Sequence, residues 1–264
     1  MRIVSCASPN HDARPQGAPI DILVLHYTGM KTADEALTRL TDPASKVSAH
    51  YTIGRDGRVF SHVPEERRAW HAGASYWAGE RNVNARSIGI ELVNPGHEFG
   101  YVPFTREQIA ALVDLARGIL ERHPIPPHRV VGHSDVAPAR KTDPGELFPW
   151  KQLAEWGIGL WPALPPSVSR SALDTSPASG GGKRTTTFPP PLAEEVDAGA
   201  KQRRTEGGTA AQSLARFGYG VPPEVDVPLP TVIMAFQRHF RPTRIDGVWD
   251  SECGQIAQAL LAKS

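Results

Sequence analysis

The stretch IDILVLHY, residues 20–27, is nearly continuously apolar and rich in Ile, Leu and Val. A strand that is buried on both faces of a sheet has this composition. The segment that follows, TADEALTRL (residues 32–40), has a Thr32/Glu35 capping pattern and places its apolar residues on one helical face. A buried strand followed at once by an amphipathic helix is typical of α/β folds, so this part of the chain predicts the fold class.

Further segments extend the same pattern along the chain. Residues 47–63 contain two β-type runs around the turn sequence GRDG, which predicts a hairpin. Residues 87–94, SIGIELVN, predict another short apolar strand, and residues 105–122 predict a long helix with one apolar face. A short strand is expected again around residues 129–132. We therefore expect an α/β fold with a mixed central β-sheet flanked by helices.

The composition of the chain changes at about residue 163. Residues 163–204 are rich in Pro, Ser, Thr and Gly and show no periodicity, which is typical of a flexible linker. Residues 205–264 contain three short helical patterns, in a segment near the lower size limit for independent folding. We predict an α/β domain over residues 1–162, a linker over 163–204, and a small C-terminal helical domain over 205–264 on that tether.

The overall composition restricts the classes of partner. The chain has 264 residues, 40% of them hydrophobic, and a formal net charge of +1, so no global field favours nucleic acid. No run approaches the ~20 apolar residues of a membrane span. Cys6 and Cys253 do not suggest a disulfide framework. The first residues lack the apolar segment of a signal peptide, so we expect a cytoplasmic protein, with the periplasm or envelope as the alternative, and a monomer.

Two histidines and one aspartate stand where strands end. His26 ends the first strand, and His133 and Asp143 lie in the loop sequence GHSDVAPARKTDPGELFPW, residues 132–150. Loops at strand ends can direct side chains into a shared cleft. Two imidazoles and one carboxylate, with a fourth position left to water, are the ligand set of a catalytic zinc site rather than of a closed structural one. The residue types therefore predict Zn²⁺ as the cofactor.

Five segments of the chain carry a resemblance to a known family. They are, in order, VLHYTG, SAHYTIGRDG, HAG, SIGIEL and GHSDVAPARKTDPGELFPW. In this order they resemble the zinc-dependent N-acetylmuramoyl-L-alanine amidases of the type-2 family, which share their fold with peptidoglycan-recognition proteins. The resemblance spans about residues 8–157. SPNHDARP near the start and AFQRHFRPTRIDGVWD in the tail are similar to a subgroup with a C-terminal peptidoglycan-binding module.

The resemblance implies a role for each of five residues. His26, His133 and Asp143 become the zinc ligands, Glu91 the catalytic acid/base, and Lys141 its helper. The chemistry agrees with these roles, because zinc makes water a nucleophile at neutral pH. A glutamate can then take a proton from that water and pass it to the departing amine. A lysine can stabilise the oxyanion together with the metal.

Structural alternatives exist for these residues. Glu91 could pair with Arg86, and Lys141 could balance Asp143 or Asp135, since such pairs are common on protein surfaces. Asp135 itself is expected to hydrogen-bond nearby backbone in the loop rather than to bind metal. These alternatives predict ion pairs, whereas the catalytic roles predict side chains directed into one cleft.

Four further residues are candidates for contact with the substrate. His50 and His71 fall in motif positions near the expected cleft, whereas His62 is expected to be a strand residue. Trp77 and Asn84 resemble family positions that line the substrate groove. An aromatic residue at position 77 can also simply cover the core.

The predicted function is hydrolysis of the amide bond between N-acetylmuramic acid and L-alanine, in peptidoglycan or in its muropeptide fragments. One alternative is a module of the same fold that binds peptidoglycan without cutting it; the presence of Asp143 and Glu91 argues against this. Another is a zinc peptidase, for which an HExxH motif is expected and does not occur. The C-terminal helices would hold insoluble substrate near the enzyme.

Overall fold

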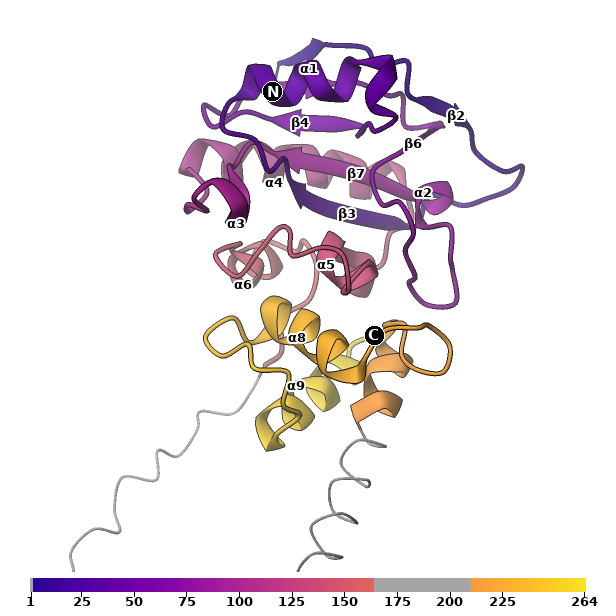
Figure 1. Cartoon of the computed structure of the whole chain (residues 1–264), viewed down its shortest axis with the longest axis vertical. Helices are drawn as coiled ribbons and strands as arrows, with labels where there is room; N and C mark the ends of the chain where they lie inside the picture. The colour runs from indigo at the N-terminus through magenta and orange to yellow at the C-terminus, as the bar shows by residue number, and fades with distance from the viewer. Residues whose placement is uncertain (1, 164–209) are drawn as a thin grey trace, which may run out of the picture.

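The central feature of the computed structural model, which describes residues 2–163 and 210–264, is a six-stranded sheet (Figure 1). Its strand order is β1 (Ile3–Ser5), β5 (Val59–Ser61), β4 (Tyr51–Ile53), β7 (Ser87–Leu92), β3 (Ile22–Tyr27) and β8 (Val130–Gly132). All neighbours are parallel except β4 and β5, which form the predicted antiparallel hairpin. The mixed sheet confirms the predicted fold class.

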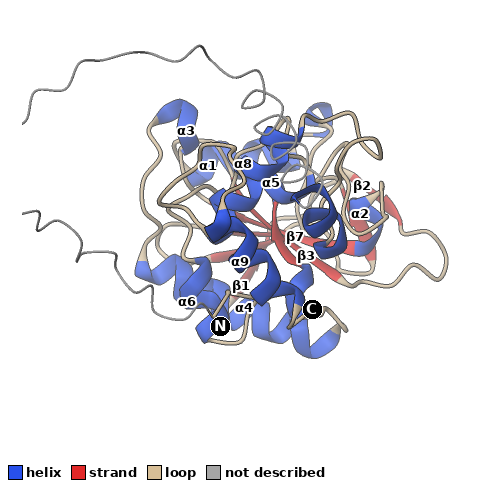
Figure 2. Cartoon of the chain, turned by 90° about the horizontal axis from the view of Figure 1, so that it is seen from below, coloured by secondary structure: helices blue, strands red, loops and turns tan. Residues whose placement is uncertain are grey.

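Helices connect and cover these strands (Figure 2). In the described part of the chain they are α1 (Ala33–Thr41), α2 (Val83–Arg86), α3 (Gly96–Phe99), α4 (Arg106–Arg122), α5 (His133–Val136), α6 (Trp150–Glu155), α8 (Leu229–Phe240) and α9 (Ser251–Leu261), with residues 210–217 also helical. Thr32 and Thr105 cap α1 and α4 with their side chains, as the sequence predicts. Two short 3₁₀ turns, Pro43–Ser45 and Pro127–Arg129, and a small antiparallel sheet of β2 (His11–Ala13) and β6 (Arg67–Ala69) complete the fold.

The strands β3 and β7 divide their side chains between two environments. In a strand, successive side chains point to opposite faces of the sheet. Leu23 and Leu25 of β3, with Ile88, Ile90 and Leu92 of β7, pack in one core with the buried face of α4. The alternate residues of these strands face the other way, and they include His26 and Glu91. The apolar half of each strand therefore anchors the sheet, and the other half is free to build a site.

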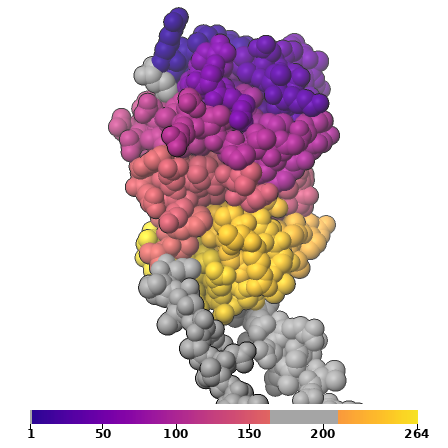
Figure 3. All heavy atoms as spheres, turned by 90° about the vertical axis from the view of Figure 1, so that its left-hand side faces the viewer, coloured from indigo at the N-terminus to yellow at the C-terminus, as the bar shows by residue number. Residues whose placement is uncertain are grey.

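The C-terminal helices share a hydrophobic core with the α/β part. Ile22 and Val24 of β3 belong to the same buried cluster as Leu214, Val232 and Phe236 of the tail. Figure 1 shows α8 beside α5, with α9 beyond α8, and in Figure 3 the yellow C-terminal residues form one continuous body with the salmon segment that precedes residue 163. Burial of this much apolar surface is the main source of stability in a fold.

The shared core is a contact that the predicted division into an α/β domain, a linker and a helical domain did not include, and the division itself stays a prediction. The helical character of the tail is as expected, and its apolar residues lie in one buried cluster with each other and with residues of the α/β part. The predicted linker, residues 163–204, lies outside the described residues except for residue 163. Within the described ranges, no helix combines the length and the apolar character that crossing a bilayer requires.

Candidate metal centre and active site

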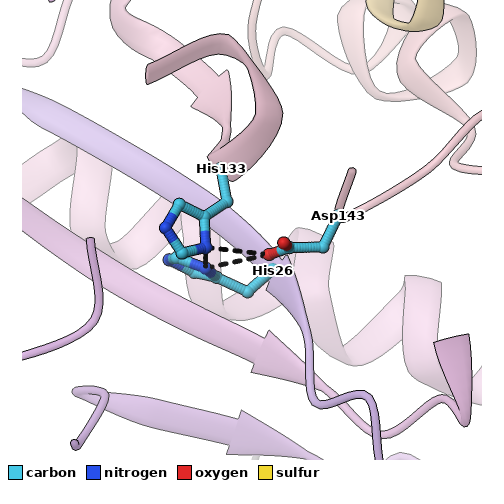
Figure 4. A group of neighbouring side chains, drawn as sticks. All are labelled: His26, His133 and Asp143. Carbon is cyan, nitrogen blue, oxygen red and sulfur yellow. Dashed lines mark hydrogen bonds and ion pairs between the residues drawn. The ribbon is translucent and has the colours of Figure 1, made fainter. Parts of the chain in front are cut away.

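Three buried side chains converge at the carboxyl ends of β3 and β8 (Figure 4). His26 lies near the end of β3, His133 opens α5 directly after β8, and Asp143 comes from the loop that follows. His26 Nδ1 is 2.9 Å from His133 Nδ1, and Asp143 Oδ2 is 3.1 Å from each of these nitrogens. Ligand atoms around a tetrahedral zinc ion, at about 2.0–2.1 Å from it, lie about 3.3 Å apart. The spacing of the three atoms therefore fits a single zinc ion.

Hydrogen bonds on the far side of both rings determine where their protons lie. His133 Nε2 is 3.1 Å from the backbone carbonyl of Ala72, which can only accept, so this nitrogen carries the proton. On the other ring, His26 Nε2 is 3.1 Å from His71 Nδ1. His71 Nε2 is in turn 3.1 Å from Ser87 Oγ, whose hydroxyl donates to the carbonyl of Val83 at 2.7 Å.

This chain of bonds has one consistent direction. Because Ser87 donates to a carbonyl, it accepts from His71 Nε2, and His71 Nδ1 then accepts from His26 Nε2. In the neutral rings, the Nδ1 atoms of His26 and His133 therefore carry no proton. Their lone pairs point toward each other and toward Asp143 Oδ2. Three electron-rich atoms at such distances repel one another unless a cation lies between them. Hydrogen bonds of this kind orient metal-binding histidines in known sites.

Gly89 of β7 provides the space for the His71 ring. A Cβ atom at position 89 would lie 2.5 Å from His71 Cγ, which is closer than real contacts allow. The backbone N–H of Gly89 also donates to His50 Nδ1 at 3.0 Å. The residues of β7 that face the site are thus Ser87, which fixes His71, Gly89, which admits it, and Glu91. The alternation within SIGIEL explains why this apolar strand contains a serine, a glycine and an acid.

The electrostatics of His26 and Asp143 favour the states that bind a cation. Burial and the neighbouring His133 lower the pKa of His26 to about 4, so the ring is neutral at neutral pH. Burial alone would raise the pKa of Asp143, but its contacts with His133 and His26 outweigh burial and hold it well below its usual value. Neutral imidazole and ionised carboxylate are the forms that coordinate metals.

Glu91 is the register partner of His26 on the adjacent parallel strand. The half-buried Glu91 side chain lines the metal-site cavity, and its Oε2 atom is buried without a hydrogen-bond partner among the described residues. Burial, reinforced by the charge of Asp143, raises the pKa of Glu91 well above its ordinary value. The pairing with Arg86 is not formed, because Arg86 binds Asp21 instead. A buried carboxylate left free beside a metal site is positioned for proton transfer.

A cavity of about 410 Å³ opens over the metal site. Glu91, His133, Lys141 and Asp143 all contribute to its lining. Neither Asp143 nor Asp135 lies within ion-pair distance of the Lys141 ammonium group, so the alternative of a simple charge pair is not formed. The volume is in the range of sites for small molecules.

One wall of this cavity consists of residues that the sequence analysis missed. Tyr27 Oη lies 2.9 Å from His97 Nδ1 and 3.1 Å from Thr142 Oγ1, and His97 Nε2 lies 3.0 Å from Glu146 Oε2. Tyr27 directly follows His26, and Thr142 directly precedes Asp143, so adjacency to the predicted ligands was the available signal. His97 lies in the short helix α3, and nothing in the sequence pattern marks it.

Arg140 joins two loops beside the metal site and was also missed. Its guanidinium donates to the carbonyl of Ala72 at 3.0 Å and also to that of Ala74. The carbonyl of Ala72 also accepts the hydrogen bond from His133 Nε2. Arg140 therefore holds in place the carbonyl that orients the His133 ring. The signal in the sequence was its place immediately before Lys141.

Of the four predicted substrate residues, His71 alone contributes to the cavity lining, where it also supports His26. His50 is buried away from the cavity and contacts Arg14 and the backbone of Arg67. The side-chain oxygen of Asn84 accepts hydrogen bonds from the backbone N–H groups of residues 71 and 72. Asn84 therefore supports the backbone that carries His71, and the His50 ring packs edge-on against the His71 ring at a centroid distance of 5.7 Å.

Trp77 lies in a different place from the predicted groove. Its side chain is 1% exposed and packs edge-on against Tyr219 and Phe217 of the tail, at centroid distances of 4.9 and 6.1 Å. Covering the core was the alternative expected for this residue, and its burial against Tyr219 and Phe217 fits that role. A contact with the substrate does not fit a side chain that the C-terminal helices cover.

Comparison with known proteins adds to this geometry. The family described as N-acetylmuramoyl-L-alanine amidase matches residues 16–146, a span that contains the three metal-site residues as well as Glu91 and Lys141. N-acetylmuramoyl-L-alanine amidase AmiD of Escherichia coli (strain K12) is 40% identical over 261 residues, which cover 92% of this chain and 83% of that protein. The chain belongs to the N-acetylmuramoyl-L-alanine amidase family.

Two solved structures are similar to this amidase over most of its length. One is AmiD from E. coli in complex with anhydro-N-acetylmuramic acid-L-Ala-D-γ-Glu-L-Lys, with a TM-score of 0.71, 38% identity, and coverage of 94% of this amidase and 92% of that chain. The other is AmpDh3 from Pseudomonas aeruginosa in complex with anhydromuramic pentapeptide, with a TM-score of 0.72, 35% identity and coverage of 94% of each chain. The similarity of this amidase therefore extends beyond the matched family span, residues 16–146.

Proposed function

We propose that this amidase hydrolyses the amide bond between N-acetylmuramic acid and L-alanine with a zinc ion held by His26, His133 and Asp143. The observation that carries the proposal is the set of two unprotonated imidazole nitrogens and one carboxylate oxygen, 2.9–3.1 Å apart, beside a cavity. When bound, zinc supplies Lewis-acid chemistry that makes water a nucleophile at neutral pH.

Glu91 serves as the proton carrier in this proposal. It leaves the sheet on the same face as His26, lines the cavity, and has a carboxylate oxygen with no partner among the described residues. Such a group can accept a proton from the attacking water and deliver it to the nitrogen of L-alanine as the C–N bond breaks. Its raised pKa helps the second step, because a weaker acid holds the proton until the amine leaves.

Lys141 stabilises the negative charge that develops on the amide oxygen. Its side chain lines the same cavity as Glu91 and Asp143, and these two carboxylates leave it unpaired. A cation that is fixed before reaction, in a site that excludes bulk water, lowers the energy of the oxyanion more than it lowers that of the substrate. A cation that was already neutralised by a close carboxylate would do this less well.

The substrate we propose is a muropeptide that carries the N-acetylmuramoyl–L-alanine linkage. The solved structures of AmiD and AmpDh3 contain anhydromuramyl peptides, and the cavity of this amidase, about 410 Å³, suits a part of such a molecule. Assays on soluble muropeptides and on insoluble sacculi, with products identified by mass spectrometry, test the substrate class. Release of the intact stem peptide with a free L-alanine amino group is the expected product in both assays.

A binding module that does not cut its ligand is the competing function. It would need neither a free acid nor a free lysine in the cavity. Among the described residues, Glu91 has an oxygen without a hydrogen-bond partner, and Lys141 lines the same cavity without an ion pair to Asp143 or Asp135. The expected monomer, and the cytoplasm or alternatively the periplasm or envelope as its compartment, stay predictions. Light scattering and cell fractionation test them.

A further inference from the structure

Asp135 joins the metal-site loop to the C-terminal helices. Its side chain, in a residue 1% exposed, accepts three hydrogen bonds of 2.7 Å each. The backbone N–H of Gly132 donates to Oδ2, which is the local loop contact expected from the sequence. The other two donors come from the tail: the phenol of Tyr219 binds Oδ1, and Nδ1 of His239 binds Oδ2.

The position of Asp135 connects these donors to a metal ligand. Gly132 ends β8 and His133 begins α5, so the N–H group that Asp135 holds belongs to the residue directly before the ligand. The same oxygen that receives this N–H group also receives His239. A displacement of His239 would therefore move Asp135 Oδ2, and with it the backbone directly before His133.

Close packing around Gly132 also connects His239 to the segment that carries His133. The His239 ring stacks on Trp150 with a centroid distance of 3.8 Å. A Cβ atom at Gly132 would lie 3.3 Å from Trp150 and 2.7 Å from Pro144, the residue after the ligand Asp143. The close packing leaves little room for the chain around His133 and Asp143 to adjust if one neighbour moves.

The tail holds both donors rigidly. Tyr219 is 1% exposed and packs against Trp77, and the N–H group of Ala78 donates to the carbonyl of Gly218 at 2.7 Å. Burial and the charge of Asp135 raise the pKa of Tyr219 well above its usual value, so the phenol stays protonated and can donate. His239 is fixed between two aromatic rings, Trp150 and Phe240, each at 3.8 Å.

We propose that Tyr219 and His239 are positioning residues of the metal centre, which act through Asp135 to hold the backbone that carries His133. The C-terminal helices are then part of the catalytic scaffold and not only a unit that binds wall polymer. This inference rests on the proposed zinc site, and it predicts that small changes in the tail alter the metal itself. Supporting residues around a metal site typically change its affinity by about 10–100-fold when they are replaced.

The test compares zinc affinity in single variants of the full-length protein. Tyr219→Phe removes one hydroxyl and keeps the ring, and His239→Phe removes a donor and keeps the stacking. His239→Asn is the conservative variant, because its side-chain amide can donate from about the place of Nδ1. Val232→Ala is the matched control: Val232 is fully buried in the same cluster, on the same helix as His239, and its side chain has no hydrogen-bonding group for Asp135.

Zinc affinity is measured by competition with a chelator, and the visible spectrum of the Co²⁺-loaded protein reports the coordination geometry. We expect Tyr219→Phe and His239→Phe to bind zinc about 10-fold more weakly and to shift the cobalt spectrum. His239→Asn should recover most of the affinity. Val232→Ala should lower the melting temperature and leave both readouts as in the wild type.

Two results would overturn the proposal, and they separate a failure of the tail contacts from a failure of the metal assignment. If wild-type protein binds one zinc per chain, and Tyr219→Phe and His239→Phe bind it within twofold of wild type with an unchanged cobalt spectrum, the tail is only a structural cover. If wild-type protein binds no zinc, the metal assignment itself is wrong and this proposal is wrong with it. Should His239→Phe fail to fold, the result for Tyr219→Phe decides alone.

Discussion

His26 and Glu91 are register partners on the parallel strands β3 and β7, so a metal-site residue and the acid beside it leave the same face of the sheet one strand apart. Neighbouring strands are about 4.7–4.9 Å apart. The hydrogen bonds of the two strands therefore determine the distance between the proposed zinc ligand and the proposed proton carrier. A slip of one residue would turn one of the two side chains into the opposite core, where α4 packs.

The first prediction concerns this acid. Glu91→Gln keeps the shape of the side chain and removes its capacity to carry a proton. Because general acid–base catalysis contributes about 10²–10⁴-fold, we expect hydrolysis of a soluble muropeptide to fall by about that factor, with zinc content unchanged. Turnover measured beside metal analysis gives the answer. Activity within a factor of a few of the wild type would exclude Glu91 as the proton carrier.

His71 is predicted to support zinc binding without touching the metal. His71→Leu removes the acceptor for His26 Nε2, so the His26 ring is free to rotate or to change its tautomer. We expect zinc affinity to fall by about 10–100-fold in chelator competition.

The control for His71 is another buried histidine. His62 contacts Thr52 Oγ1 and the carbonyl of Cys6, and it does not line the cavity. His62→Gln should lower stability and leave zinc affinity unchanged. Equal losses of zinc affinity in His62→Gln and His71→Leu would show that the effect is general destabilisation.

Gly89 offers a test by steric conflict. An added methyl group at this position meets the His71 ring at 2.5 Å, and overpacking of this kind costs typically about 1–3 kcal/mol in the free energy of unfolding. We expect Gly89→Ala to lower stability in urea denaturation by that amount and to weaken zinc binding, since His71 must move. Gly254→Ala is the contrasting variant, because nothing lies within 4 Å of its added methyl group on α9. In a helix that change should stabilise the protein by about 0.5–1 kcal/mol.

The acid stability of the protein should depend on Glu65, which does not line the metal-site cavity. Burial raises the pKa of Glu65, but hydrogen bonds from Arg122, His123 and Tyr51 outweigh burial and lower it to about 2. A carboxyl group with a depressed folded-state pKa adds stability above its unfolded pKa, near 4.5, and that stability is lost as the pH falls toward about 2. The loss is on the order of 2 kcal/mol, because Arg122 is half exposed and solvent screens its charge.

Urea denaturation at several pH values between 5 and about 2.5 measures this dependence. Glu65→Gln should be less stable than the wild type at pH 5, and the difference should shrink as the pH falls. A difference that stays constant across this range would mean that the titration of Glu65 does not contribute.

Local patterns in the sequence predicted much of the fold. The apolar run that ends in His26 and the capping pattern of Thr105 with Gln108 each determine their element through nearby residues, and the structure has both elements where they were expected. The three metal-site residues could also be predicted from the sequence. His26 lies near a strand end, and His133 and Asp143 lie in a loop that one motif covers. In each case the information lies within a few residues of the feature.

Contacts between distant segments could not be predicted in the same way. Tyr219 and His239 bind Asp135 across 84 and 104 residues, and no pattern near either residue indicates its partner. Trp77 shows the consequence, because the motif placed it at a groove while its burial depends on the tail that covers it. A tail that was read as a separate tethered unit gave no reason to expect such contacts.

The central claim is that His26, His133 and Asp143 hold the zinc ion at which this amidase works, and the zinc content of purified Asp143→Ala tests it most directly. Asp143 Oδ2 supplies the single carboxylate of the proposed ligand set. Elemental analysis of wild type and variant, prepared and dialysed together, should find one zinc per chain in the wild type and almost none in Asp143→Ala. Equal zinc in both proteins, at one per chain, would contradict the account.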